Sequence, residues 1–364
     1  MRIETVTIKN FRNIEKATLD TNKQFVVLYG PNGAGKTSIL EAVDVLCSLR
    51  SFREPSPNNL IQMGFPSCFI EATAQSVLGK QKLLWGYHGS KGRLLQMDGK
   101  NIRDLELWFQ SLRAILFCPE NIDIVKGSPQ VRRQFVDRAK FTADPSYLDT
   151  VRKYLFVLEQ KRELFKKEVV TENELLPWNK QLVEYGSKII SGRIDILEQL
   201  SFPFQDIHQQ ISGGDKATLQ MQGVGAGTKE AAQKYFVDLS TKVAAEELKK
   251  RQILVGPHKD DLHISLNDML AKKFASQGQV RSIVVSLKLA ELEAAKYRGE
   301  KPLFLLDDLS SDLDLERRKK LVEMLADRDS QVWITTTQPN FLQNLPSSRV
   351  AKFYVENGIV QKES

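Results

Sequence analysis

A glycine-rich segment near the N-terminus has the residue types that bind nucleotide phosphates. Its sequence, Gly30-Pro31-Asn32-Gly33-Ala34-Gly35-Lys36-Thr37, fits the pattern Gly-x-x-x-x-Gly-Lys-Thr. The glycines let consecutive N–H groups face phosphate oxygens, Lys36 reaches the β- and γ-phosphates, and Thr37 ligates Mg²⁺. An ordinary Gly-rich turn gives no reason for this lysine and this hydroxyl. We therefore expect a site for a nucleotide and Mg²⁺ that extends to Ser38, where a helix follows.

Two carboxylates near the other end of the chain have the chemistry to complete such a site. Asp307 and Asp308 directly follow four apolar residues, Leu303 to Leu306, that are typical of a buried strand. In that position Asp307 is expected to face the Mg²⁺ held by Thr37, and Asp308 the γ-phosphate. Asp308 can orient or deprotonate the attacking water, but it reaches less far than a glutamate, so we expect slow hydrolysis. The ordinary alternative is an acidic turn after a strand.

The segment Ser276-Gln277-Gly278-Gln279 precedes residues 280–297, whose apolar positions are spaced as in a helix. Taken alone, this segment is interpreted as a capping serine followed by a permissive glycine. Its order along the chain, between the phosphate loop and the acidic strand end, suggests a second role considered below.

The elements expected around these residues alternate between strands and helices. The N-terminal part has loosely alternating residues from Ile3 to Ile8, a continuous apolar run from Phe25 to Tyr29, and a helical stretch from Ser38 to Ser48. Residues 67–100 predict an antiparallel meander that ends at Asp98-Gly99. Near the C-terminus, residues 303–306 and 332–335 predict short buried strands, separated by a helix over residues 315–326.

The middle of the chain has mainly helical spacing. A helical hairpin is expected between Pro145 and Leu200 with its break at Thr171 to Pro177, followed by a helix over residues 229–250 and strands at Ile253 and Leu262. We therefore expect an α/β fold in which residues 1–120 and 250–364 form a mixed-sheet core with an antiparallel β lobe. Residues 121–249 are expected to form a largely helical inserted domain.

Composition restricts the class of protein. Of 364 residues, 41% are hydrophobic and 27% charged, which excludes a fully disordered chain. No apolar run has the length of a membrane span, and the start of the chain lacks the apolar stretch of a signal peptide, so we expect a cytoplasmic protein with no membrane partner. The three cysteines are far apart and are expected to be buried thiols.

Basic residues exceed acidic residues by seven, 52 against 45, which favours a polyanionic partner. Two basic segments stand out. We consider as candidate contacts with such a polyanion the residues Lys80, Lys82, Lys91 and Arg93 in the meander, and Arg132 and Arg133 further along. Internal ion pairing is the alternative for the two arginines.

The order of these motifs resembles the ABC-type ATPase heads of chromosome-maintenance and repair proteins, and most closely the RecF family. The resemblance covers nearly the whole chain. Besides the phosphate loop, the matching segments are Lys9-Asn10-Phe11-Arg12-Asn13, Phe117-Cys118-Pro119-Glu120, Gly127-Ser128-Pro129 with Arg132-Arg133-Gln134-Phe135-Val136-Asp137, Gly256-Pro257-His258-Lys259-Asp260-Asp261 and Ser276-Gln277-Gly278-Gln279. The last two, so spaced, are very specific. The resemblance implies ATP as the nucleotide.

The resemblance also assigns roles to single residues. Ser276, Gly278 and Gln279 would complete the ATP site of a second subunit, so that two chains enclose two nucleotides head to tail. Glu120 lies near the position of the Q-loop glutamine, and Thr337 at the position of the switch histidine of transporter-type proteins. Because a hydroxyl cannot be a cationic ligand of the γ-phosphate, Thr337 again implies slow turnover. Arg12 would approach the nucleotide or form an ion pair, and the interface loop would contain Asp312 and Asp314.

RecF-like proteins bind DNA where single and double strands meet and act with RecO and RecR to place RecA on single-stranded DNA covered by SSB. The resemblance implies the same for this chain, as a weak DNA-dependent ATPase whose ATP-dependent homodimer binds gapped duplex. The chain shows no base-reading motif, so recognition is expected to follow DNA structure. His258 and His263 are expected to be structural rather than metal ligands.

Two alternative functions differ in what they would require. An SMC or Rad50-like head would need long coiled-coil arms, whereas each inserted helix here spans only about 30 residues, or about 45 Å. A transporter-type ATPase subunit is disfavoured by the helical insertion, Glu120 and Thr337.

Overall fold

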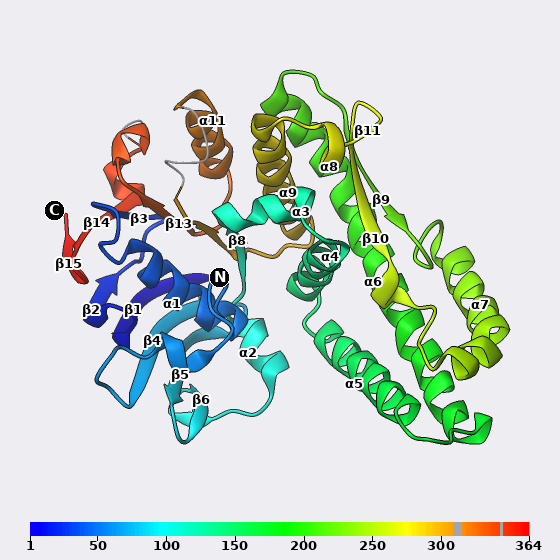
Figure 1. The fold of residues 1–364 in the computed structure, drawn as a ribbon. Helices are drawn as coiled ribbons and strands as arrows, with labels where there is room; N and C mark the ends of the chain where they lie inside the picture. The colour runs from blue at the N-terminus through cyan, green and yellow to red at the C-terminus, as the bar shows by residue number, and fades with distance from the viewer. Residues whose placement is uncertain (309–314, 343–344, 364) are drawn as a thin grey trace. The chain divides into compact units, whose positions relative to one another are not determined.

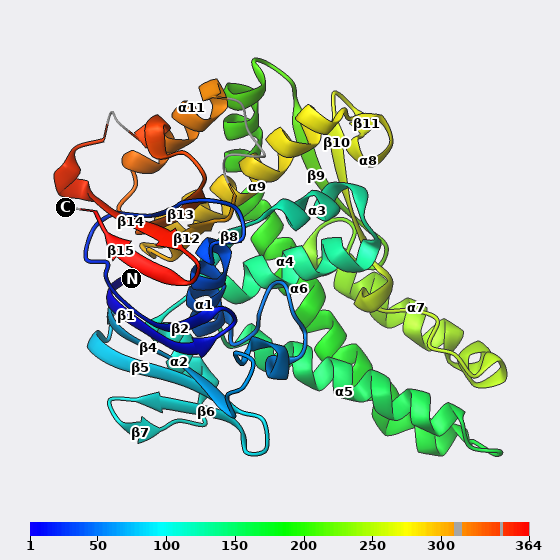
Figure 2. The same ribbon diagram turned by 60° about the vertical axis from the view of Figure 1, so that its left-hand side comes forward.

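An antiparallel sheet begins at the N-terminus. Its strand order is β2-β1-β4-β5-β6-β7, formed by β1 (Arg2–Phe11), β2 (Ile14–Asp20), β4 (Ser67–Ser76), β5 (Gly79–His88), β6 (Gly92–Met97) and β7 (Lys100–Asn101) (Figures 1 and 2). The structure, a computed structural model, describes residues 1–308, 315–342 and 345–363. The meander expected over residues 67–100 is confirmed.

The second sheet contains the buried apolar runs. Its order is β15-β14-β3-β13-β12-β8, formed by β3 (Phe25–Tyr29), β8 (Ala114–Phe117), β12 (Leu303–Leu306), β13 (Val332–Thr336), β14 (Val350–Glu356) and β15 (Ile359–Lys362). Pairing is parallel except between β14 and β15. Because the five strands β14, β3, β13, β12 and β8 run in one direction, their carboxyl ends meet at one edge of the sheet.

The helix after β3 is buried on nearly all sides. α1 (Lys36–Ser48) contacts β1, β4 and β5 of the first sheet and β8 and β13 of the second, which is why most of its residues, polar ones included, are buried. α2 (Leu105–Ser111) is capped by Asp104, which accepts hydrogen bonds from two backbone N–H groups of its first turn. α11 (Leu315–Ala326) spans the residues expected to be helical between the two C-terminal strands.

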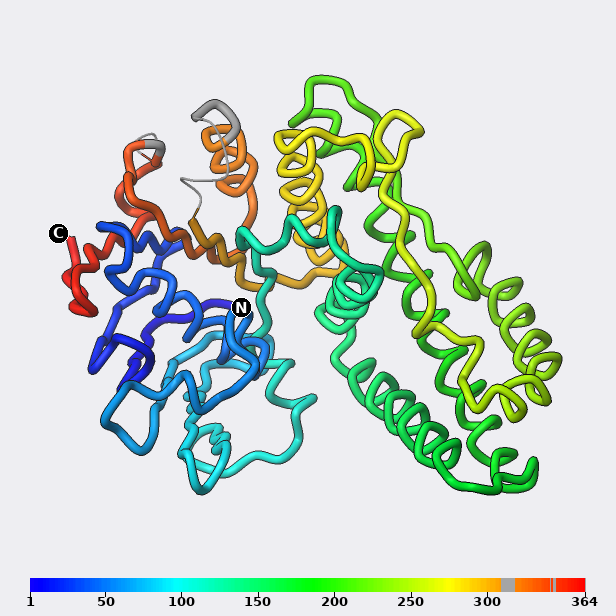
Figure 3. Tube along the Cα trace, viewed as in Figure 1, coloured from blue at the N-terminus to red at the C-terminus, as the bar shows by residue number. Residues whose placement is uncertain are grey.

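The chain divides into two compact units. The first contains Met1–Asn121 and Glu291–Ser364, and the second Ile122–Ala290. All of the expected inserted domain except residue 121 falls in the second unit, which also includes residues 250–290. In Figure 3 the second unit is the run of colour from cyan-green to yellow. The helix α9 (Gln277–Tyr297) begins in the second unit and ends in the first.

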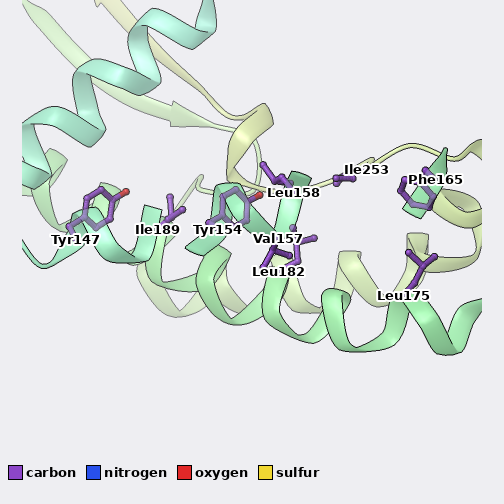
Figure 4. Packing of buried hydrophobic residues seen from close by; sticks show 9 residues of the cluster. All are labelled: Tyr147, Tyr154, Val157, Leu158, Phe165, Leu175, Leu182, Ile189 and Ile253. Carbon is purple, nitrogen blue, oxygen red and sulfur yellow. The ribbon is translucent and has the colours of Figure 1, made fainter. Parts of the chain in front are cut away.

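The second unit is mainly helical, with one small sheet. It contains α3 (Asp123–Lys126), α4 (Pro129–Ala143), α5 (Tyr147–Phe165), α6 (Glu172–Ser212), α7 (Lys229–Lys250), α8 (Ala271–Phe274) and the antiparallel sheet of β9 (Ala217–Gln222), β10 (Asp261–Leu266) and β11 (Met269–Leu270). Long apolar stripes hold the helices together. Figure 4 shows the cluster that α5 and α6 bury, which includes Tyr154, Val157, Leu182 and Ile189.

Three details of the second unit differ from the expected elements. The break between the hairpin helices precedes residue 172, because Thr171 and Glu174 form a reciprocal capping box that starts α6 there, and Pro177 lies inside the helix. Ile253 is not in a strand. Its apolar side chain packs into the hydrophobic cluster of α5 and α6. The strand β9, whose residues alternate between apolar and polar, was not among the expected elements.

All three cysteines are buried thiols, as expected. No helix in the described ranges is both long enough and apolar enough to cross a membrane.

Candidate functional site

The phosphate loop lies between β3 and α1, at the sheet edge where the parallel strands end. Gly30 has a φ of 142°, and a Cβ there would lie 2.2 Å from the carbonyl oxygen of Val355. Gly35, which caps α1, has a φ of 111°, and a Cβ there would lie 2.8 Å from the Asn13 side chain. Both positions therefore require glycine, because the backbone is left-handed and the neighbouring atoms are too close.

Two turns outside the loop fix its shape. Asn13, in the turn between β1 and β2, accepts a 2.8 Å hydrogen bond from the Ser38 hydroxyl. Gly358, in the turn between β14 and β15, donates its N–H to the carbonyl of Ala34 at 2.9 Å. The loop therefore has a backbone shape set by the fold, as a preorganised anion site requires.

Lys36 is folded back over the loop. Its ammonium donates hydrogen bonds to the carbonyls of Gly30 at 2.8 Å and Pro31 at 2.7 Å. Burial lowers the pKa of Lys36, while the nearby carboxylates of Asp308 and Asp307 act in the opposite direction. This is a cation held inside the loop by groups that a phosphate can replace.

Thr37 and Asp307 meet across the sheet edge. The Thr37 hydroxyl donates to Oδ1 of Asp307 at 2.9 Å, although 270 positions separate the two residues. Thr335, at the end of β13, donates to the same oxygen at 2.7 Å. Burial raises the pKa of Asp307, and hydrogen bonds from Thr335 and Thr37 act against that rise. A hydroxyl beside a carboxylate is a pair of hard oxygen ligands, which fits Mg²⁺.

Asp308 follows at the mouth of the same edge. Its backbone has a φ of 48°, unusual for a residue other than glycine, and its N–H donates to the Thr335 hydroxyl at 2.8 Å. The backbone conformation that directs its side chain is thus held by a neighbouring strand.

Glu120 and Thr337 also follow strands of this edge. Glu120 is exposed on the 3₁₀ helix Pro119–Ile122, directly after β8, and Thr337 is half-buried directly after β13. Since Asp307 donates its N–H to the carbonyl of Phe117, the last residue of β8, the carboxyl end of β8 lies beside the acidic pair. The structure thus brings both residues to the expected edge.

Arg12 is engaged in an ion pair. Its guanidinium forks onto the Glu41 carboxylate of α1, with hydrogen bonds of 3.0 and 2.7 Å, and also donates to the carbonyl of Asn59. The Glu41 side chain is fully buried. Of the two roles expected for Arg12, the structure displays the ion pair, with a buried partner.

Ser276 and Gln279 form a reciprocal cap at the start of α9. Ser276 donates its N–H to the Gln279 side chain at 2.9 Å, and the Ser276 hydroxyl accepts the N–H of Gln279 at 3.3 Å. This is the ordinary capping role, yet Ser276 and Gln277 are exposed and Gly278 is half-buried. The helix therefore presents an accessible N-terminus. The interface-loop residues Asp312 and Asp314 lie outside the described residues.

Arg132 and Arg133 are used inside the second unit. Arg132 forks onto Asp261 at 2.6 and 2.8 Å with its side chain 5% exposed, and Arg133 donates to the carbonyl of Asp260. Internal pairing, the alternative considered for these arginines, is the arrangement found. A DNA phosphate could reach Arg132 only by breaking a buried ion pair.

The basic residues of the β lobe do not lie on one face. Lys80 and Lys82 lie two positions apart on β5 and therefore point to the same face of the sheet. Both side chains are about 60% exposed, and they form ion pairs with Glu4 and Glu71. Arg93 is in register with Tyr87, so it lies on the opposite side of the sheet, and Lys91 lies in the turn before β6. Only the two lysines on β5 form a shared exposed surface.

His258 contacts a tyrosine of α5 inside the second unit. Its ring lies 2.7 Å from the Tyr154 hydroxyl, and burial together with nearby cations lowers its pKa to about 3. His263 lies on β10. Within the described ranges, no three histidines, cysteines or carboxylates are arranged to hold a metal ion.

Three contributors to the site were not identified from the sequence: Thr335, Glu41 and Gly358. Thr335 had a detectable signal, because three successive threonines end a buried strand at the edge where the acidic pair lies. Glu41 and Gly358 had none, since their contacts with Arg12 and Ala34 depend on tertiary packing.

The chain is similar to known proteins over almost its whole length. The model of the RecF/RecN/SMC N terminal domain matches residues 2–361. Proteins called DNA replication and repair protein RecF are similar over almost their whole length: that of Geotalea daltonii is 32% identical over 97% of both chains, and that of Thermosynechococcus vestitus 36% identical over 93% of this chain and 91% of its own.

Solved structures agree as well. The recombination mediator protein RecF-ATP in the RecFOR pathway superposes with a TM-score of 0.88 at 27% identity, over 100% of this chain and 97% of its own. An Smc head bound to the C-winged helix domain of ScpA, at 14% identity and a TM-score of 0.60 over 100% of this chain and 97% of its own, shares the fold alone.

Proposed function

This chain belongs to the RecF family, and from that premise we propose that it is an ATP-dependent DNA-binding protein of recombinational repair and replication-fork maintenance. The observation that carries the proposal is the hydrogen bond between Thr37 and Asp307, which joins the phosphate loop to the acidic strand end. ATP is held by the loop residues 30–38, with Lys36 on the β- and γ-phosphates. Thr37 and Asp307 supply oxygen ligands for Mg²⁺, which neutralises phosphate charge when bound.

The second half of each ATP site comes from another copy of the chain. The exposed N-terminus of α9, with Ser276 and Gly278, offers backbone N–H groups and a helix dipole to the γ-phosphate of a partner's nucleotide. Two chains then enclose two nucleotides head to tail, and ATP stabilises the homodimer.

Hydrolysis is slow and separates the two chains. Asp308 orients the attacking water, and Glu120 senses the nucleotide from the neighbouring strand end. Thr337 supplies no positive charge to the γ-phosphate, which lowers turnover. Such a weak, DNA-dependent ATPase acts as a timer for the dimer rather than as a motor.

DNA binds to the dimer through its backbone, at gaps and at junctions of single and double strands. Lys80 and Lys82 are the contacts that we favour, because both lysine side chains are exposed, and ion pairs made by exposed lysines are weak and exchange readily. A RecF of known structure is described as a recombination mediator in the RecFOR pathway. By similarity, this chain acts with RecR and RecO to help place RecA on single-stranded DNA covered by SSB.

The experiment that tests this function measures binding to a gapped duplex with ATP, with ADP and without nucleotide. We expect tight binding to the gapped duplex only in the presence of ATP. The Lys36→Met variant, which removes the ligand of the phosphates, should lose this ATP-dependent binding. Equal binding in all three nucleotide states, or unchanged ATP-stimulated binding by Lys36→Met, would contradict the proposal.

A further inference from the structure

We propose that Thr335 is a positioning residue that holds the Asp307 carboxylate and the Asp308 backbone in place for Mg²⁺ and ATP. The inference rests on the proposed function, because it concerns the same nucleotide site.

The hydroxyl of Thr335 makes two hydrogen bonds with defined directions. It donates to Oδ1 of Asp307 at 2.7 Å and accepts the N–H of Asp308 at 2.8 Å. Since a hydroxyl has one proton, donation to Asp307 fixes its orientation and leaves a lone pair for Asp308. Thr335 is only 1% exposed, so water does not compete for these bonds.

Strand pairing explains why Thr335 can serve both residues. β12 and β13 are parallel, with Leu306 in register with Ile334. Asp307, the first residue after β12, therefore lies beside Thr335, which is still within β13 and in register with Leu28 of β3. The hydroxyl reaches across to the neighbouring chain segment at the point where that segment changes from strand to loop.

The two bonds have different consequences. Oδ1 of Asp307 accepts from both Thr37 and Thr335, so the carboxylate keeps a buried donor that is independent of the phosphate loop. Partners of this kind orient metal ligands, and their loss weakens metal affinity. At Asp308 the bond supports a backbone with a φ of 48°. Without it, this residue is expected to relax toward a more common conformation.

The adjacent threonine offers a matched control. Thr336 is also buried at the end of β13, but its hydroxyl bonds to the backbone of Gln338, where it donates to the carbonyl at 3.1 Å and accepts the N–H at 3.2 Å. Removing this hydroxyl disturbs the turn after β13 without removing the hydrogen bond to the Asp307 carboxylate or the one from the Asp308 backbone.

The test compares Thr335→Val, Thr335→Ser and Thr336→Val in the full-length chain. A fluorescent ATP analogue is titrated onto each variant without Mg²⁺, and Mg²⁺ is then titrated into the complex. For Thr335→Val we expect unchanged affinity without Mg²⁺ but a Mg²⁺ requirement raised about tenfold, the lower end of the 10–100-fold loss seen when such partners are removed. Thr335→Ser should restore the wild-type requirement, and Thr336→Val should retain it.

An unchanged Mg²⁺ requirement in Thr335→Val, or an equal rise in Thr336→Val, would overturn the inference. If circular dichroism shows that Thr335→Val is unfolded, Thr335→Ala takes its place in the same comparison. Failure of the wild-type chain to bind the analogue at all would instead contradict the proposed function, so the two failures are distinguishable.

Discussion

Arg132 forks onto the Asp261 carboxylate inside the second unit, with both hydrogen bonds shorter than 3 Å. The pair joins the start of α4 to the start of β10, two segments 129 positions apart. Close by, Arg193 forks onto Asp137 at 2.8 Å and reaches Asp260 at 3.9 Å. A basic sequence segment thus becomes part of a buried ion-pair network rather than a binding surface.

Removing one partner of this network is expected to destabilise the protein. Asp261→Asn leaves the Arg132 guanidinium buried with a weaker acceptor, so we expect the free energy of unfolding to fall by about 2–4 kcal/mol. Chemical denaturation measures the loss. The control is Glu184→Gln, which breaks an exposed pair with Lys188 and should cost less than about 1 kcal/mol. Equal, small effects of both changes would count against a structural role of the network.

The basic face of β5 is expected to carry a measurable part of DNA binding. The double variant Lys80→Gln with Lys82→Gln should bind gapped duplex more weakly. The slope of log affinity against log salt concentration should become less steep by about 2, because two phosphate contacts are lost. Lys301→Gln with Lys362→Gln removes the same charge from exposed, ion-paired lysines elsewhere in the first unit. Identical salt slopes for the two double variants would refute a specific contribution of β5.

Asp308→Asn is expected to separate ATP binding from hydrolysis. The amide keeps the shape of the side chain but cannot accept a proton from water, so we expect turnover to fall by about 10²–10⁴-fold while ATP binding persists. The ATP-bound dimer should then accumulate in sizing chromatography. Hydrolysis at the wild-type rate would show that another group acts on the water.

Acid is expected to weaken the fold through His258. Its pKa is lowered from 6.5 to about 3, so between these values the unfolded chain binds a proton that the folded chain does not, and stability falls as pH falls below 6.5. At pH 5 this amounts to roughly 1–2 kcal/mol. His258→Gln should therefore be less sensitive than the wild type to a shift from pH 7 to pH 5, measured by chemical denaturation. Asp260, whose pKa is raised to about 6, acts in the opposite direction in both proteins and so does not affect the comparison. An equal loss of stability in both chains would contradict this assignment.

The local parts of the site were predictable from the sequence because they depend on neighbouring residues. The run from Gly30 to Thr37 is recognisable from its own glycines, its lysine and the apolar strand before it, and Leu303 to Asp308 has the pattern of a buried strand with an acidic end. Parallel pairing then brings both to one edge. The role of Arg132 could not be predicted in this way. An arginine that forms a buried ion pair and an arginine that binds DNA look the same in the sequence. Thr335 likewise depends on the register between β12 and β13.

The central claim, that each ATP site combines Lys36 of one chain with Ser276 of its partner, is tested most directly by mixing two inactive variants. Each site of a Lys36→Met or a Ser276→Arg homodimer carries one lesion. A mixed dimer places both lesions in one site and leaves the other intact, so an equal mixture should recover ATP hydrolysis at about a quarter of the wild-type level. Lys36→Met mixed with the chain carrying both substitutions should recover none. Absence of recovery in the first mixture, with both variants folded, would contradict a shared site.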